Sequence, residues 1–184
     1  MTISTIGHSN HPLEKFIEML TAHGIELIAD VRTVPRSRHN PQYNSDVLPA
    51  SLREQGMAYR HLPDLGGLRH AKKDSLNTGW ENATFRGFAD YMQTESFEKG
   101  LAELIALADG TKVALMCAEA LPWRCHRSLI ADALMVRGIT VMHIMSRTAA
   151  NEHTLTPFAK VNGTTITYPG DAPLQLDIFH GSEH

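Results

Sequence analysis

The chain has 184 residues, of which 42% are hydrophobic, and its formal net charge is −3 at neutral pH. This length and composition suffice to bury the core of one domain, and the mild charge argues against a protein that coats nucleic acid or membranes. No run of about 18 apolar residues occurs, and the first residues lack the charged and apolar regions of a signal peptide. We therefore expect a cytoplasmic protein that has no membrane partner.

Charge is unevenly distributed along the sequence. The segment 30–73 carries a net charge of +4, which leaves −7 for the rest of the chain. This segment could form ordinary solvated loops, or it could line a cleft that attracts an anionic substrate.

Hydrophobic periodicity predicts alternating strands and helices in the first half of the chain. Residues 3–6 predict a strand, and apolar residues at helical spacing over 13–20 predict a helix that ends at Gly24 and is capped by Ser9 or Asn10. The next elements are expected to be a strand over 25–31, a short helix over 48–55, a strand over 57–62, and an exposed loop or lid up to residue 82.

The second half continues the alternation. Its expected elements are helices over 85–92 and 97–107, a strand over 113–116, a helix over 129–135, a strand over 139–144, and a turn at 162–163 between two short strands. This order predicts the α/β class, with a single domain over 1–184, a mostly parallel sheet and helices on both faces. Residues 149–184 are expected to pack on that domain as a C-terminal extension.

Four polar clusters each follow a predicted strand. They are G-H-S at 7–9, D-V-R at 30–32, L-P-D-L-G-G at 62–67 and C-A-E at 117–119. Ligands of open parallel sheets bind at the carboxyl ends of the strands, so we expect these clusters to meet in one cleft. His8, Ser9 and Glu119 could act there as general acid or base. Asp30 and Arg32 could form a buried ion pair, which would be either functional or purely structural.

The segment 117–128, C-A-E-A-L-P-W-R-C-H-R-S, is the richest in polar chemistry. It leads into a helix N-terminus, where unpaired backbone N–H groups and the helix dipole attract anions. Arg124, Arg127 and Ser128 add donors, and Arg127 is the expected main anion contact because it lies in the first helical turn. Alternatively, these side chains only cap and solvate the helix end, or Arg127 pairs with a carboxylate of Glu119 or Asp30.

The chain has two cysteines, Cys117 and Cys125, which are too few for a disulfide framework, and we expect both to be reduced. Cys117 could be a nucleophile, because a helix N-terminus and nearby arginines lower the pKa of a thiol, or it could be buried and inert. The layout of strand, Cys, loop, Arg and helix is similar to that of rhodaneses and cysteine phosphatases, although the Cys-to-Arg spacing does not fit a phosphatase loop. The spacing of the Cys and His residues is not that of a metal site, so no metal or other cofactor is expected.

The chain contains five motifs in a fixed order: T-I-G-H-S (5–9), A-D-V-R-x-x-P-R-S (29–37), H-L-P-D-L-G-G-x-R (61–69), G-F-A-D-Y-M (87–92) and M-C-A-E-A-x-P-W-R-C-H-R-S-L-I-A-D-A-L (116–134). In this order they resemble the domain-of-unknown-function family 488. The resemblance covers about residues 3–146 and implies one α/β domain of bacterial or archaeal type, without assigning a biochemistry.

Three functions remain as hypotheses. The first is an enzyme that acts on a phosphorylated or nucleic-acid-related substrate, with His8, Glu119 or His126 moving protons. Its expected anion-binding residues are Ser9, Asp30, Arg32, Arg36, Ser37, Arg124, Arg127 and Ser128. The second is a rhodanese-like cysteine enzyme in which Cys117 carries a sulfur or phosphoryl group. The third is a non-catalytic module that binds a nucleotide or nucleic acid. The expected partner is a small anionic substrate or a nucleic acid, and the sequence leaves the oligomeric state open.

Overall fold

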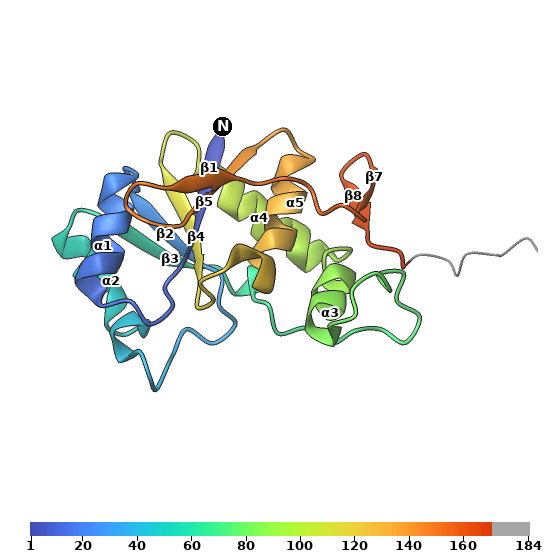
Figure 1. The fold of residues 1–184 in the computed structure, drawn as a ribbon, viewed down its shortest axis with the longest axis horizontal. Helices are drawn as coiled ribbons and strands as arrows, with labels where there is room; N and C mark the ends of the chain where they lie inside the picture. The colour runs from blue at the N-terminus through green and yellow to red at the C-terminus, as the bar shows by residue number, and fades with distance from the viewer. Residues whose placement is uncertain (171–184) are drawn as a thin grey trace, which may run out of the picture.

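A computed structural model describes residues 1–170, in which a six-stranded sheet lies between two layers of helices (Figure 1). The strand order is β3-β2-β4-β1-β5-β6. The strands are β1 (Thr2–Gly7), β2 (Leu27–Asp30), β3 (Ala58–His61), β4 (Val113–Cys117), β5 (Thr140–Ile144) and β6 (Ala150–Glu152). All pairs are parallel except β5 with β6, which confirms the predicted α/β class with a mostly parallel sheet.

The helices cover both faces of the sheet, as the alternating pattern predicts. α1 (Leu13–Ala22) and α2 (Leu48–Glu54) lie on one side, to the left in Figure 1. α3 (Ala83–Tyr91), α4 (Glu95–Leu107) and α5 (Arg127–Met135) lie on the other side. No helix within residues 1–170 is long and apolar enough to cross a membrane.

Each face of the sheet has its own hydrophobic core, and β4 contributes to both. Successive side chains of a strand point to opposite faces. Ala114 and Met116 therefore pack in the core under α1 and α2, whereas Leu115 and Cys117 belong to the core under α3, α4 and α5. The whole strand is buried. This alternation directs the Cys117 thiol toward the α5 side of the sheet.

Helix ends were predicted better than helix starts. Gly24 and Gly138 follow α1 and α5 with φ of 68° and 79°, in the left-handed region that glycine adopts without strain. The predicted capping of α1 by Ser9 or Asn10 is wrong. Pro12 is the N-cap residue and no side chain caps this helix, because residues 8–11 form a turn in which Ser9 itself has a φ of 48°.

The loop from 66 to 82 contains no helix or strand, as expected, but a buried carboxylate holds it in place. Asp90 of α3 accepts hydrogen bonds from the Lys72 backbone N–H at 2.8 Å, the Ser75 hydroxyl at 2.6 Å and the Asn77 amide at 2.7 Å. These bonds lower the pKa of Asp90 although its burial acts in the opposite direction. The loop is therefore an ordered wall beside the carboxyl edge of the sheet.

The segment after β5 is attached to α5 by a second buried carboxylate. It contains β6 and the hairpin of β7 (Lys160–Asn162) and β8 (Thr165–Thr167), which confirms the predicted turn between two short strands, although the turn residues are 163–164 and not 162–163. Asp132 is fully buried and accepts hydrogen bonds from His153 at 2.7 Å, from the backbone and hydroxyl of Thr156, and from the Tyr168 hydroxyl at 2.8 Å. Residues 171–184 of the expected extension lie outside the described part of the chain.

Asp132→Asn should destabilise the protein, because an amide turns two donor hydrogens toward groups that are themselves donors. We expect the free energy of unfolding to fall by about 2–4 kcal/mol in urea denaturation. Asp109→Asn is the matched control, since Asp109 is exposed, and it should have little effect. Equal effects of the two variants would contradict an anchoring role for Asp132.

Candidate functional site

The carboxyl ends of β1, β2 and β4 lie at the lower edge of the sheet in Figure 1. Residues at and after these strand ends line a cleft of about 410 Å³. Its walls combine the loops after these strands with the loop at 67–68 and the start of α3. This is the edge at which open parallel sheets bind ligands.

The cleft brings together most, but not all, of the predicted site residues. Those that line it are His8, Arg32, Arg36, Ser37, Cys117, Glu119, Arg124 and His126. Those that do not are Ser9, Asp30, Arg127 and Ser128. The lining also includes residues absent from the predicted set, namely Thr33, Val34, Gly67, Leu68, Thr84, Phe85, Ala118 and Cys125. Gly67 belongs to a motif at a strand exit, whereas Thr84 and Phe85 start a helix and carry no sequence signal of a site.

The guanidinium of Arg32 forms hydrogen bonds within the protein, which leaves little of it for a ligand. It donates to both carboxylate oxygens of Asp30, at 2.9 and 2.7 Å, and to the Tyr43 carbonyl at 2.7 Å. Tyr59 donates to the same carboxylate. Asp30 is fully buried and Arg32 is 6% exposed, so the two charges neutralise each other inside the fold. Arg32 thus shapes the cleft floor and offers little to an anion.

His8 is a neutral ring fixed in one orientation. Its Nδ1 lies 2.7 Å from the Ser9 carbonyl, which makes Nδ1 the donor, and its Nε2 lies 3.4 Å from Arg32 Nη1. The ring stacks on Tyr43 with a centroid distance of 4.2 Å. Burial, helped by the charge of Arg32, lowers its pKa from 6.5 to about 4. The sequence assigned His8 to proton transfer, but both ring nitrogens already have partners.

His126 is also neutral, and the position of its hydrogen decides whether the ring nitrogen that faces Cys125 can accept a hydrogen bond. Its Nε2 lies 3.0 Å from both the Val31 and Leu65 carbonyls, so Nε2 carries the hydrogen. The bare Nδ1 then faces Cys125 Sγ at 3.5 Å. Burial, with the charges of Arg127 and Arg69, lowers the pKa of His126 to about 4. Only glycine fits at 67, because a Cβ there would lie 2.5 Å from His126 Nδ1.

The two cysteines are free thiols in contact at the base of the cleft. Their Sγ atoms lie 2.6 Å apart, and they are 3% and 7% exposed. Residues 118–124 carry the chain from Cys117 to Cys125 through a short 3₁₀ turn, Pro122–Arg124. This loop therefore brings the Cys125 thiol into contact with the Cys117 thiol.

Arg127 lies beneath this pair, not in the cleft. It is 1% exposed and donates to the Ala120 carbonyl at 2.8 Å, while its Nε and Nη1 have no hydrogen-bond partner. No carboxylate within residues 1–170 pairs with it, neither Glu119 nor Asp30. A Cβ on Gly7 would lie 2.8 Å from Arg127 Nη1 and would overlap the Glu119 carbonyl oxygen, so this guanidinium is directly under the end of β1.

The environment shifts the pKa values of the two cysteines in opposite directions, downward for Cys117 and upward for Cys125. Burial opposes ionisation of Cys117, but the hydrogen bond from Cys125 and the positive charge of Arg127 outweigh it and lower its pKa. The pKa of Cys125 is raised by burial and then by its hydrogen bond to Cys117 and the charge there. A buried guanidinium without a carboxylate partner is costly, and its positive charge is one of the causes that lower the pKa of Cys117.

Two arginines at the rim remain available to an anionic ligand. Arg36 is 67% exposed, with Asp46 no nearer than 4.0 Å, and Arg124 is exposed on the 3₁₀ turn. Ser37 accepts from the Asn40 backbone N–H and so builds its own loop. The exposed guanidinium groups of the cleft are thus at its mouth.

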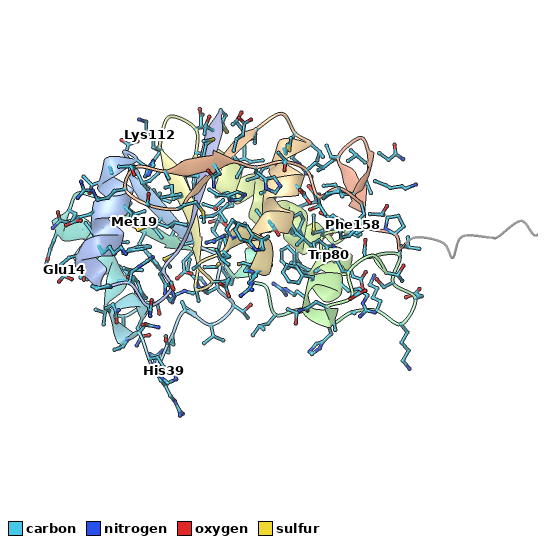
Figure 2. The ribbon with its side chains drawn as sticks, viewed as in Figure 1. Glu14, Met19, His39, Trp80, Lys112 and Phe158 are labelled. Atoms are coloured by element: carbon cyan, nitrogen blue, oxygen red, sulfur yellow. The ribbon has the colours of Figure 1, made fainter. Side chains whose placement is uncertain are left out.

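A second cavity of about 410 Å³ lies on the other side of the 3₁₀ turn and is lined by both tryptophans, Trp80 and Trp123, and by Ser128. Trp80 contacts Phe158 at a centroid distance of 4.9 Å (Figure 2). His143 and His153 line it too, but their ring nitrogens are occupied by Thr5, by each other and by Asp132. No group of three or more metal-ligating side chains occurs within residues 1–170.

The chain matches the family model described as Domain of unknown function DUF488 over residues 12–134, more than half of its length. The chain belongs to this family. The match confirms the resemblance that the motifs indicated. The matched region of this DUF488 protein includes both cysteines, His126 and Arg127. No curated protein and no solved structure matches the chain. These comparisons do not show the similarity of layout to rhodaneses.

Acid should destabilise the protein through its buried neutral histidines. His8, His126 and His143 each have a pKa lowered from 6.5 to about 4, first by burial, so between these values the unfolded chain binds more protons than the folded one. Stability should therefore fall as the pH drops from about 6.5 toward 4, by about 1 kcal/mol per pH unit for each histidine. Urea denaturation at pH 7, 6 and 5 measures this slope.

The histidine origin of that slope is tested by two variants. His8→Asn should reduce the pH dependence, whereas His39→Asn should leave it unchanged, because His39 is exposed on the loop after β2 (Figure 2). A slope that His8→Asn does not alter would assign the acid sensitivity to other groups.

Proposed function

We propose that the cleft is the active site of a cysteine enzyme in which Cys117 attacks a small anionic substrate and carries a group from it. The observation that carries this proposal is the buried guanidinium of Arg127, which has two unpartnered nitrogens beside a thiol whose pKa is lowered. The paired register of Gly7 with Cys117, and the position of Arg127 under Gly7, support their proximity.

The covalent step would use the residues as they lie. The Cys117 thiolate donates its electron pair to the electrophilic atom of the substrate, and the bond from that atom to the leaving group breaks. The leaving group departs with the bonding electrons as an anion. Arg36 and Arg124 at the rim would hold the anionic charge of the substrate, and the Cys125 thiol would donate a hydrogen bond to Cys117 before the attack.

The acid–base enzyme suggested by the sequence has weaker support. His8 and His126 would have to move protons, yet His8 is held by Ser9 and Arg32, and His126 donates to two backbone carbonyls. A non-catalytic binding module would not need a cysteine with a lowered pKa, such as Cys117. Neither alternative accounts for a buried arginine that lacks a carboxylate.

Iodoacetamide alkylation tests the nucleophile. Cys117 should react fastest, with a pH–rate profile displaced to lower pH than that of an ordinary thiol, and Cys117→Ser should abolish this fast phase. Arg127→Gln removes the positive charge under the thiol, so we expect alkylation at pH 7 to slow by about tenfold, with the profile moved to higher pH. Peptide mapping after alkylation identifies the modified cysteine.

Two arginine variants separate charge from folding in this experiment. Arg127→Lys keeps the charge and should restore part of the rate, while Arg124→Gln, at the exposed rim, should leave the profile nearly unchanged. A Cys117 profile at ordinary alkaline pH in the wild-type protein would reject the proposed nucleophile.

A further inference from the structure

Cys125 has a geometry of its own that a single nucleophile does not require. Its Sγ lies 2.6 Å from Cys117 Sγ and 3.5 Å from His126 Nδ1, and it lines the same cleft. Because His126 donates from Nε2 to Val31 and Leu65, its Nδ1 lone pair is the acceptor that faces this sulfur. Cys125 thus has a sulfur to attack on one side and a hydrogen-bond acceptor on the other.

We propose that Cys125 is a resolving cysteine and that the substrates of this cleft are anionic sulfur electrophiles, that is, small disulfides that carry carboxylate or similar charge. This inference rests on the proposed role of Cys117 as nucleophile. It adds the substrate class and assigns a second thiol to the reaction.

The two steps balance in atoms and electrons. In the first, the Cys117 thiolate attacks one sulfur of the substrate, the substrate S–S bond breaks, and half of the substrate leaves as a thiolate. In the second, Cys125 attacks Cys117 Sγ and expels the other half of the substrate, which takes up the proton of Cys125 and leaves as a thiol. The substrate gains two electrons, and the cysteine pair loses them and becomes a disulfide. A low-molecular-weight thiol would then reduce the pair again.

Charge around the pair favours this order of events. Burial and the negative charge on Cys117 both raise the pKa of Cys125 before the reaction. Once Cys117 is bonded to half of the substrate, its negative charge is gone, and the charge of Arg127 acts on Cys125 alone. Formation of the mixed disulfide therefore activates the second thiol.

A second thiol in contact with the first distinguishes sulfur from other transferred groups. Attack on Cys117 Sγ can expel a fragment that is bound through sulfur, because the departing atom is a thiolate. It cannot expel a fragment bound through phosphorus or carbon in the same way. The exposed guanidinium groups of Arg36 and Arg124 at the mouth of the cleft supply the preference for anionic fragments.

Intact-mass spectrometry of the full chain tests the proposal with dithiodiglycolate, a small dianionic disulfide. Fully reduced wild type, Cys117→Ser and Cys125→Ser proteins are mixed with the probe, quenched in acid and weighed. We expect wild type to lose the mass of two hydrogens and retain no adduct, and Cys125→Ser to retain one mercaptoacetate on Cys117. Cys117→Ser lacks the proposed nucleophile and cannot form the internal disulfide, so it should not lose two hydrogens, and any mercaptoacetate that it retains should map to Cys125.

The outcomes separate the two proposals. A stable adduct on wild type as well as on Cys125→Ser would overturn the resolving role and leave Cys117 as the nucleophile. No adduct on Cys125→Ser, in a protein whose Cys117 still shows fast alkylation, would overturn the substrate class. Absence of both the adduct and the fast alkylation would overturn the proposed function itself.

A matched cationic probe tests the charge preference. Cystamine is a disulfide of similar size with two positive charges, and rates are divided by those of free cysteine with each probe to remove intrinsic reactivity. Wild type should prefer dithiodiglycolate by about tenfold or more, and the double variant Arg36→Gln, Arg124→Gln should lose most of that preference. Equal normalised rates with wild type would reject an anionic substrate.

Discussion

The pairing of β1 with β4 is the constraint on which the site depends. Gly7 lies opposite Cys117 in the register, and the pairing continues past the strands, with His8 N–H donating to the Cys117 carbonyl and Ser9 N–H to the Ala118 carbonyl, both at 2.9 Å. Two exit loops that would otherwise diverge are thereby held side by side. The close approach leaves no room for a side chain at Gly7, and the cysteine loop closes over Arg127 at this point.

Two buried arginines in this protein are balanced in different ways. Arg32 is neutralised by Asp30 in a bidentate pair, with Tyr43 and Tyr59 completing the hydrogen bonds, and so contributes shape. Arg127 has one backbone acceptor and no carboxylate within residues 1–170. A charge buried without a counter-ion is costly, and the positive charge of Arg127 helps to lower the pKa of the neighbouring Cys117 thiol. Arg32 therefore stabilises the fold through its ion pair, whereas Arg127 changes the pKa of a cysteine.

Sequence patterns predicted the fold because they depend on local periodicity. Strand and helix positions followed from apolar spacing and glycine stops, and the convergence of four strand exits followed from the parallel arrangement. Most of the predictions that failed required long-range contacts. Arg127 sits in the first turn of α5, as expected, but its side chain runs under Gly7 instead of into the cleft. The pairing of β6 and the contribution of Thr84 and Phe85 to the cleft, which the sequence did not predict, likewise depend on tertiary packing. The predicted cap of α1 failed for a local reason, the turn that precedes the helix.

The buried carboxylate of Asp132 links the family region to the C-terminal part of the chain. The matched family region ends at residue 134, whereas the side chains that donate to Asp132 come from His153, Thr156 and Tyr168. A carboxylate in the middle of α5 is therefore tolerable only in the company of that later segment. Among DUF488 chains, an acidic residue at this position and a donor-rich segment beyond β5 should be inherited together, and chains that lack the segment should carry an apolar residue there. The helix that holds Arg127 would then be anchored by a different means in each branch of the family.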